Sequence, residues 1–282
     1  MEIVKTIKQV RAAVSDARKA GKKIGLVPTM GALHSGHVSL IDRAVADCDF
    51  VVVSIFVNPT QLGPNEDFDK YPRDLDADAG VCQKAGVDVI FAPGASEMYP
   101  SENITWVSVE KITDPLCGAG RPGHFRGVTT VCTKLFNIVL PDAAFFGQKD
   151  AQQAIVIKRM VADLNMPLDI VVCPTVRQED GLALSSRNKY LSDAERKDAL
   201  LISKALKACD KAIAGGENDA EKLLNLMKDI LGSGAVDIEY LSIADAATLE
   251  NVLKIEGQVL VAIAVRVGKT RLIDNILVDL NK

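Results

Sequence analysis

The chain has 282 residues, of which 48% are hydrophobic and 25% charged, as is typical of globular proteins that fold in water. Its formal net charge of −4 excludes a protein that binds nucleic acid through a broad basic face, although binding a nucleotide needs only a few well-placed donors. No apolar run is long enough to span a membrane, and the first residues do not form a signal peptide. The six cysteines include no C-x-x-C pair, so we expect reduced, mostly buried thiols in a cytoplasmic protein.

The first 14 residues have the spacing of an amphipathic helix, and strand and helix patterns alternate after them. Continuous apolar runs indicate strands that are buried on both faces. This rhythm predicts a parallel, doubly wound sheet, which binds ligands beyond the carboxyl ends of its strands. The predicted strands are Ile24–Pro28, Phe50–Val57, Asp88–Ala92, Ala143–Phe146 and Leu168–Cys173, and the predicted helices are Gly36–Cys48, Arg73–Ala85, Phe125–Leu140 and Asp150–Leu164.

The rhythm changes after Pro174, where two helical patterns come first and three strand patterns follow. Such an order indicates a smaller α+β domain, and a chain of this length is expected to have more than one core. We therefore predict an α/β protein with a Rossmann-like doubly wound parallel sheet over residues 1–175 and a smaller α+β C-terminal domain over residues 176–282. The predicted C-terminal elements are helices Ser192–Ala214 and Asp219–Leu231 and strands Asp237–Ser242, Gln258–Val267 and Arg271–Val278.

Two of the three histidines, His34 and His37, stand where a predicted strand gives way to a helix. Their spacing puts both rings on one face of the first helical turn, where free N–H groups and the positive end of the helix dipole favour a phosphate. Gly36 leaves room for a ligand near the backbone. The spacing alone leaves two other interpretations open. One is a surface pair without function, and the other is a metal site, which needs further ligands although His124 cannot be placed from sequence.

The residues around this turn resemble the pantothenate synthetase family, which belongs to the H-x-G-H nucleotidyltransferase superfamily together with class I aminoacyl-tRNA synthetases. H-x-G-H alone is weakly specific, but four segments occur here in the family's order and spacing and cover essentially the whole chain. Leu62 is a small departure, because an aromatic residue is common at that position, but it removes no polar group. The four segments are Pro28–His37 (PTMGALHSGH), Val57–Gln61 (VNPTQ), Phe146–Gln153 (FGQKDAQQ) and Asp180–Asn188 (DGLALSSRN).

The resemblance implies an ATP-dependent ligase that condenses (R)-pantoate with β-alanine through a pantoyl-adenylate and releases AMP and pyrophosphate. It implies ATP as a substrate with Mg²⁺, no organic prosthetic group, a homodimer, and no nucleic-acid or membrane partner. It also implies that residues 1–175 bind ATP and pantoate and that residues 176–282 close over the active site. Because Mg²⁺ sits mainly on phosphates and water, we assign no residue of this chain to a metal.

Roles for single residues follow from the same resemblance. Both reactants of the activation step are anionic, so the site must neutralise charge as it develops, and neutral amides suit a small acid that carries hydroxyls. The expected catalytic residues are His34, His37, Lys149, Ser185 and Ser186. The expected ATP-binding residues are Met30, Gly31, Ala32, Leu33, His34, Ser35, Gly36, His37, Gly147, Gln148, Lys149, Asp150, Val176, Leu184, Ser185, Ser186 and Arg187. The expected pantoate-binding residues are Gln61, Gln153 and Asn58, and Gln61 is also expected to bind β-alanine.

Several of these residues have a purely structural explanation as well. Asp150 has the position of a helix N-cap, Asn58 is typical of a turn, and Ser185–Arg187 has the composition of a polar interdomain loop. The acidic residues at 74, 76 and 78 are interpreted as a helix start with favourable dipole placement. The basic, glycine-rich stretch Arg121–Gly127 either helps to close the pocket or packs at a dimer surface.

Other functions compete with the ligase. A different adenylyltransferase with the same histidine turn would transfer AMP to a phosphate-bearing acceptor, and it would not need the Asn-Pro-x-Gln and Gln-Lys-Asp segments together. An aminoacyl-tRNA synthetase would need a tRNA-binding domain, for which an acidic chain of this length leaves little room. A nucleotide-binding regulatory module would need no second substrate pocket. Release of pyrophosphate only when an acid is supplied would separate the ligase from such a module.

Overall fold

The computed structural model describes residues 1–62 and 72–280 and contains a six-stranded parallel sheet. The strand order is β1-β4-β3-β2-β5-β6, so the chain leaves β2 in one direction and later returns to its other side. The topological switch point therefore lies between β2 and β5, where open α/β sheets bind ligands. The strands are β1 (Glu2–Val4), β2 (Ile24–Thr29), β3 (Phe50–Ile55), β4 (Val89–Phe91), β5 (Ala143–Gly147) and β6 (Asp169–Cys173).

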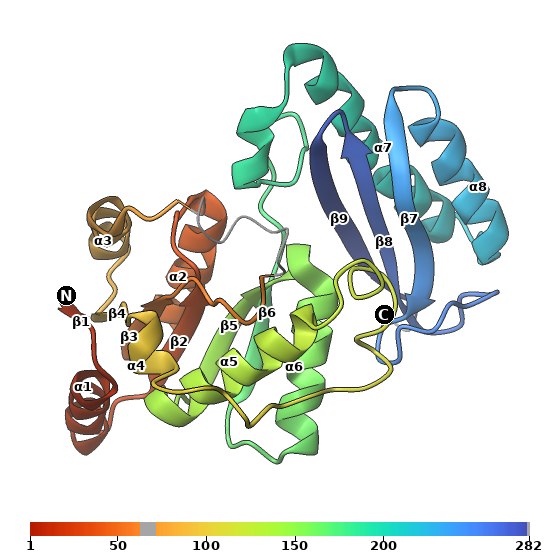
Figure 1. Ribbon diagram of the computed structural model, residues 1–282. Coiled ribbons are helices and arrows are strands. Elements are labelled where there is room, and N and C mark those ends of the chain that lie inside the picture. Colours follow the sequence, from red (N-terminus) through yellow and green to blue (C-terminus); the bar gives the residue numbers. More distant parts are fainter. Residues whose placement is uncertain (63–71, 281–282) are drawn as a thin grey trace.

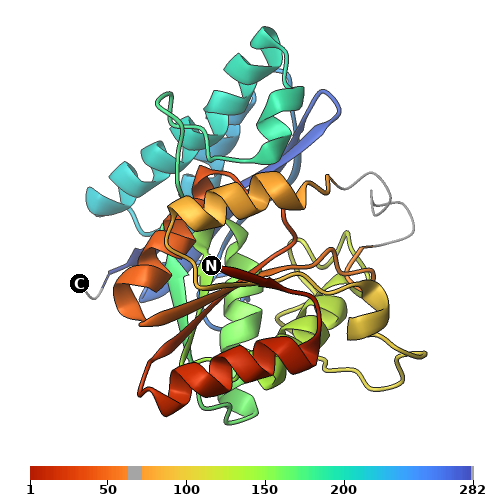
Figure 2. The ribbon, with the colours of Figure 1, turned by 90° about the vertical axis from the view of Figure 1, so that its left-hand side faces the viewer.

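Helices cover both faces of this sheet, because successive side chains of each buried strand point to opposite faces. Leu26 of β2 packs into one core and Val27 into the other, and Ala144 and Phe145 of β5 alternate in the same way. Figure 2 shows α1 on one side of the sheet and α3 on the other. One core is closed by α1 (Ile7–Lys19), α4 (Ala95–Met98), α5 (His124–Val139) and α6 (Ala151–Asp163), and the other by α2 (Ser35–Asp47) and α3 (Leu75–Lys84).

The C-terminal part folds around its own antiparallel sheet of three strands in the order β7-β8-β9. One face of β8 packs against the two helices α7 and α8, and the other face contacts the parallel domain (Figure 1). In that second contact, Leu260 and Ala262 of β8 meet Ala151 and Val156 of α6. The elements are α7 (Asp193–Ala214), α8 (Ala220–Leu231), β7 (Val236–Asp245), β8 (Gln258–Val267) and β9 (Thr270–Asp279).

The predicted fold class is confirmed: a Rossmann-like parallel sheet with a smaller antiparallel C-terminal unit. One prediction at the N-terminus is wrong, because residues 2–4 form an edge strand rather than the start of a helix. The helix begins at Ile7, since Thr6 and Gln9 form a capping box, and the β-branched residues before it pair with β4. The short helix α4 was not predicted. Within the described residues, no helix is long and apolar enough to cross a membrane.

Candidate active site

The turn after β2 is held by a buried carboxylate. Gly31 and Ala32 both have positive φ angles, +85° and +53°, which turn successive N–H groups toward one point. The carboxylate of Asp78 on α3 sits at that point and accepts hydrogen bonds from the N–H groups of Ala32 (3.0 Å) and Leu33 (2.7 Å). Asp78 is only 4% exposed, and a Cβ at position 31 would lie 2.8 Å from its Oδ2. The sequence prediction missed this role of Asp78.

His34 and His37 form a stacked pair at the start of α2, with ring centroids 4.1 Å apart. His34 is the N-cap residue, and its Nδ1 accepts a hydrogen bond from the N–H of Gly36 (3.1 Å). His37 Nδ1 accepts from the N–H of His34 (3.3 Å). Because both Nδ1 atoms are acceptors, each neutral ring carries its proton on Nε2. The pair therefore presents two N–H donors.

Burial keeps these rings neutral. It lowers the pKa of His37 to about 4, with the neighbouring His34 ring as the second cause. Burial also lowers the pKa of His34, with Lys149 as the second cause. At neutral pH the two imidazoles are thus uncharged donors, and the positive charge near them belongs to Lys149.

The His37 shift predicts a pH dependence of stability. Between its ordinary pKa of 6.5 and about 4, the unfolded chain binds a proton at His37 that the folded chain does not. The free energy of unfolding should therefore fall as pH falls through this window and be unaffected by His37 above it. In His37→Gln the slope should be shallower, while a Gln at this helix position preserves the capping box. Urea unfolding of both proteins at pH 7 and pH 4.5 measures the difference. Equal losses in the two proteins would contradict the assignment.

The helix N-terminus differs from the sequence expectation in one respect. The N–H of Gly36 is taken by the His34 ring, and the N–H of His37 donates to the carbonyl of His34 (2.7 Å). These backbone donors are therefore satisfied within the turn. The backbone donors that the sequence favoured for an anion are thus occupied, whereas each ring carries its proton on Nε2.

The turn after β5 carries Lys149 in a short 3-10 helix, Gln148–Asp150. Asp150 is the N-cap residue of α6, as its position predicted, but its side chain makes no capping hydrogen bond and is exposed. A side chain at Gly147 would meet no protein atom within 4 Å, which leaves open space beside the turn. Lys149 and Asp150 both act electrostatically on His34 and His37, so the turns after β2 and β5 face each other across the switch point.

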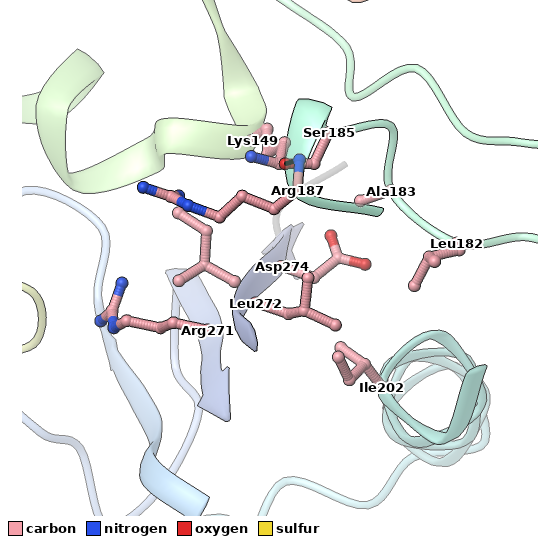
Figure 3. Close-up of a pocket in the computed structure, with 10 residues that line it drawn as sticks. Lys149, Leu182, Ala183, Ser185, Arg187, Ile202, Arg271, Leu272 and Asp274 are labelled. Carbon is pink, nitrogen blue, oxygen red and sulfur yellow. Dashed lines mark hydrogen bonds between the residues drawn. The ribbon is translucent and has the colours of Figure 1, made fainter. Parts of the chain in front are cut away.

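The loop Ser185–Arg187 follows a hairpin over residues 176–184, in which the Leu184 N–H donates to the Val176 carbonyl (2.9 Å). Ser185 caps the next 3-10 helix, Ser186–Tyr190. Leu184 reaches the histidine turn, because its Cδ2 lies 3.7 Å from the position of a Cβ on Gly36. Figure 3 shows one pocket lined by Lys149, Ser185 and Arg187, with Arg271 and Asp274 of β9 on its other wall.

The turn after β3 is organised by the side-chain amide of Asn58, which is hydrogen-bonded to protein groups at both its oxygen and its nitrogen. Asn58 is 1% exposed. Its Oδ1 accepts from the N–H and hydroxyl of Thr60 and from the hydroxyl of Tyr99. Its Nδ2 donates to Oε1 of Gln61 (3.1 Å) and to the carbonyl of Gly127 (3.3 Å). Asn58 therefore orients Gln61, whose Nε2 lies 3.0 Å from Sδ of Met30 and so reaches the turn after β2.

His124 belongs to the Gln61 turn rather than to the histidine pair. Its Nδ1 lies 2.8 Å from the carbonyl of Gln61 and its Nε2 lies 2.9 Å from Arg121. A neutral ring protonated on Nδ1 satisfies both contacts, donating to the carbonyl and accepting from the guanidinium. The basic stretch Arg121–Gly127 thus supports the turn that carries Gln61.

The segments predicted from sequence consequently meet at the carboxyl ends of β3, β2, β5 and β6, which are adjacent in the sheet. Gly31 and Asn58 are buried, and Ser35, Asp150, Ser186 and Arg187 are exposed. The predicted residues of intermediate exposure are Met30, Ala32, Leu33, His34, Gly36, His37, Gln61, Gly147, Gln148, Lys149, Gln153, Val176, Leu184 and Ser185.

A sequence model described as pantoate-beta-alanine ligase matches residues 2–277 of the chain. The chain belongs to the pantoate–β-alanine ligase family. It is 56% identical to the pantothenate synthetase of Acetivibrio thermocellus, over 99% of this chain and 100% of that protein. It is also 56% identical to the pantothenate synthetase of Moorella thermoacetica over the full length of both.

Solved structures of the family agree with this fold. The structure of pantothenate synthetase from Thermus thermophilus has a TM-score of 0.92 and 45% identity, covering 98% of this chain and 99% of that one. Pantoate–β-alanine ligase from Francisella tularensis, solved in complex with beta-gamma ATP and β-alanine, has a TM-score of 0.78 and 38% identity, with 98% and 97% coverage.

Proposed function

We propose that this chain condenses (R)-pantoate with β-alanine at the expense of ATP, forming pantothenate, AMP and pyrophosphate through a pantoyl-adenylate. The observation that supports this most strongly is the meeting of the histidine turn, the Lys149 turn and the Gln61 turn at one edge of the sheet, in a chain of the pantoate–β-alanine ligase family. The Francisella tularensis relative, solved with an ATP compound and β-alanine, supports the same choice of substrates.

In the first step, a pantoate carboxylate oxygen bonds to the α-phosphorus of ATP, and the bond from that phosphorus to the bridging oxygen of pyrophosphate breaks. Negative charge grows on the phosphate oxygens, and we assign its stabilisation to the Nε2–H donors of His34 and His37 and to the Lys149 ammonium. Neutral imidazoles suit this task, because they strengthen their hydrogen bonds as charge develops without binding the ground state as tightly as a cation would. Ser185, Ser186 and Arg187 follow the leaving pyrophosphate.

In the second step, the amine of β-alanine attacks the acyl carbon of the adenylate. The bond to the phosphate oxygen of AMP breaks, and the amine loses a proton. This step needs mainly proximity between the amine and a held adenylate. We assign pantoate to Gln61 and Gln153, with Asn58 orienting the Gln61 amide. Gln61 also approaches β-alanine.

The nucleotide is assigned to the carboxyl edge between β2 and β5, with Val176 and Leu184 beside the base and the exposed Asp150 near the ribose. In the described residues, no three His, Cys, Asp or Glu side chains gather as a metal site. We place Mg²⁺ on the ATP phosphates, as part of the substrate.

We also propose a homodimer in the cytoplasm, with residues 1–175 as the ATP- and pantoate-binding domain and residues 176–282 as the unit that closes the site. The dimer rests on the family resemblance. All six cysteines are free thiols, which supports a reducing compartment.

An assay of AMP release tests the proposal directly. ATP, Mg²⁺, pantoate and β-alanine are supplied together, and each is then omitted in turn. AMP should form in stoichiometric amounts with pantothenate only in the complete mixture. AMP formation without pantoate, or with an unrelated acid at the same rate, would overturn the assignment of substrate.

The order of the two steps gives a further prediction. Pantoate, ATP and Mg²⁺ without β-alanine should support exchange of labelled pyrophosphate into ATP, because the adenylate forms before the amine acts. Liquid chromatography of the labelled ATP measures the exchange. A strict requirement for β-alanine in this exchange would argue against a separate adenylate step.

A further inference from the structure

The turn that carries Lys149 is tied to the C-terminal sheet through one amide. The side chain of Asn275 on β9 is 5% exposed and makes three hydrogen bonds to the turn. Its Oδ1 accepts from Nε2 of Gln148 (2.8 Å), and its Nδ2 donates to the carbonyls of Gln148 (3.0 Å) and Lys149 (3.0 Å). One side chain from the second domain therefore fixes both the backbone and a neighbouring side chain of this turn.

Asp274, the residue before Asn275 in β9, holds the hairpin that leads to Ser185. The carboxylate of Asp274 makes two hydrogen bonds to Arg177, at 2.6 and 3.0 Å, and its side chain is only 2% exposed. Arg177 also donates to the carbonyl of Gly181 (3.2 Å) in the hairpin that leads to Ser185. The N–H of Asn275 donates to Oδ1 of Asp274 (2.8 Å), so the two anchors are joined to each other.

We infer that Asn275 is a positioning residue for Lys149. The Asp274–Asn275 pair of β9 also fixes the position of the Gln148–Asp150 turn relative to the hairpin over residues 176–184. The inference rests on the proposed function of Lys149. A planar amide that holds two successive carbonyls and a side-chain amide leaves the turn little freedom to rotate. Lys149 lines the same pocket as Ser185 and Arg187 (Figure 3), so the position of the turn sets where its ammonium lies relative to them. Asp274 itself lines this pocket, whereas Asn275 does not and acts through the turn.

This arrangement differs from simple packing of two domains. The apolar contact between the domains, around Leu260 and Ala262, stabilises their association but does not fix the orientation of the turn. The hydrogen bonds of Asn275 supply direction, because they fail if the turn shifts by about an ångström, and misplacement of that size can cost catalysis about 10²-fold.

The test is a double-mutant cycle in the full-length protein, read by pyrophosphate exchange with pantoate and ATP. Asn275→Ala should lower the exchange rate about 10- to 100-fold, with the KM for pantoate changed less than about twofold. The same substitution in a Lys149→Ala background should have almost no further effect, because the group that it positions is gone. If Asn275→Ala does not fold, Asn275→Asp replaces it, since that side chain has the same shape but loses the two donors to carbonyls.

Ser242→Ala is the matched control. Ser242 is 7% exposed and donates to Oδ1 of Asn251 (2.7 Å) within the C-terminal unit, so its loss removes a buried hydrogen bond of the same unit without touching the Lys149 turn. Its exchange rate should stay within about twofold of wild type. An Asn275→Ala protein with wild-type exchange, or a loss that persists in full in the Lys149→Ala background, would overturn the inference. Wild-type protein without any pantoate-dependent exchange, or a Lys149→Ala protein as active as wild type, would instead refute the proposed function.

Discussion

Lys149→Ala and His34→Asn should each lower the turnover of pantothenate formation by about 10²–10³, the usual cost of removing one donor from a developing charge. Lys149 stands on a turn of intermediate exposure and His34 at a helix terminus, so neither change opens a cavity in the core. Asn is among the best N-cap residues, and His34→Asn therefore removes the Nε2–H donor while it preserves the start of α2. Steady-state turnover in a coupled AMP assay measures both.

Lys158→Ala serves as the control for the lysine. Lys158 is an exposed residue of the same helix that follows the Lys149 turn, and its removal changes the net charge by the same amount. Its turnover should match wild type. Circular dichroism and the urea midpoint establish that all variants are folded. Near-wild-type turnover in folded Lys149→Ala or His34→Asn would remove that residue from the mechanism.

The losses of turnover caused by removing His34 and by removing Lys149 should not be independent. If both act on the same phosphate group, the double variant should be less impaired than the product of the single losses predicts. The structure supports this expectation, because Lys149 is the second cause of the lowered pKa of His34. Fully independent effects would place the two groups on different parts of the substrate.

Most of the sheet could be predicted from sequence because its strands are buried on both faces and read as continuous apolar runs. Val51, Val52 and Val53 are all 1% exposed or less, and the prediction for β3 is correct apart from its end. The prediction failed at β1, where a strand of three residues precedes a capped helix. The amphipathic pattern of the helix extends backward over those residues, and only pairing with the distant β4 makes them a strand.

The residues to which we assign the chemistry are candidates because they sit in short segments with a strong pattern, and their roles stay a prediction. The residues that hold those segments in place could not be predicted. Asp78 bonds to N–H groups 45 and 46 residues away, and Asn275 bonds to a turn 126 and 127 residues away. An Asp in the first turn of a helix and an Asn on a strand carry no local sign of such partners. Only the three-dimensional fold brings them to the site.

Asn58 shows that a sequence motif does not by itself distinguish a residue that binds a ligand from one that supports such a residue. The sequence placed it on pantoate, together with Gln61 and Gln153. In the structure, protein groups engage both ends of its amide, and this is the basis for assigning it to the orientation of Gln61. A motif identifies which residues matter, whereas contacts decide whether a residue faces the ligand or supports one that does.

Asp78→Asn should impair both stability and turnover, the second large effect that we expect. The amide oxygen can still accept from one of the two N–H groups of the Gly31–Leu33 turn, but its NH₂ group faces the other donor. A buried donor left without a partner costs about 1–3 kcal/mol, and the urea midpoint should fall accordingly. The left-handed pair Gly31 and Ala32 loses the anion that holds it, so the adjacent N-cap residue His34 should move and turnover should fall about 10- to 100-fold.

Asp74→Ala separates these two effects. Asp74 caps the same helix α3 through the N–H of Ala77 (3.0 Å), and it is exposed. Losing this cap should cost about 1 kcal/mol and leave turnover within about twofold of wild type, because the capping bond does not involve the histidine turn. If Asp78→Asn lost turnover only in proportion to its stability, as Asp74→Ala does, the carboxylate would be a structural anchor without influence on the chemistry. A much steeper loss of turnover at a comparable loss of stability would identify the Asp78 carboxylate as the group that sets the position of the His34 and His37 donors. The reason is that Asp78 holds the N–H of Leu33, and His34 is the next residue in the chain.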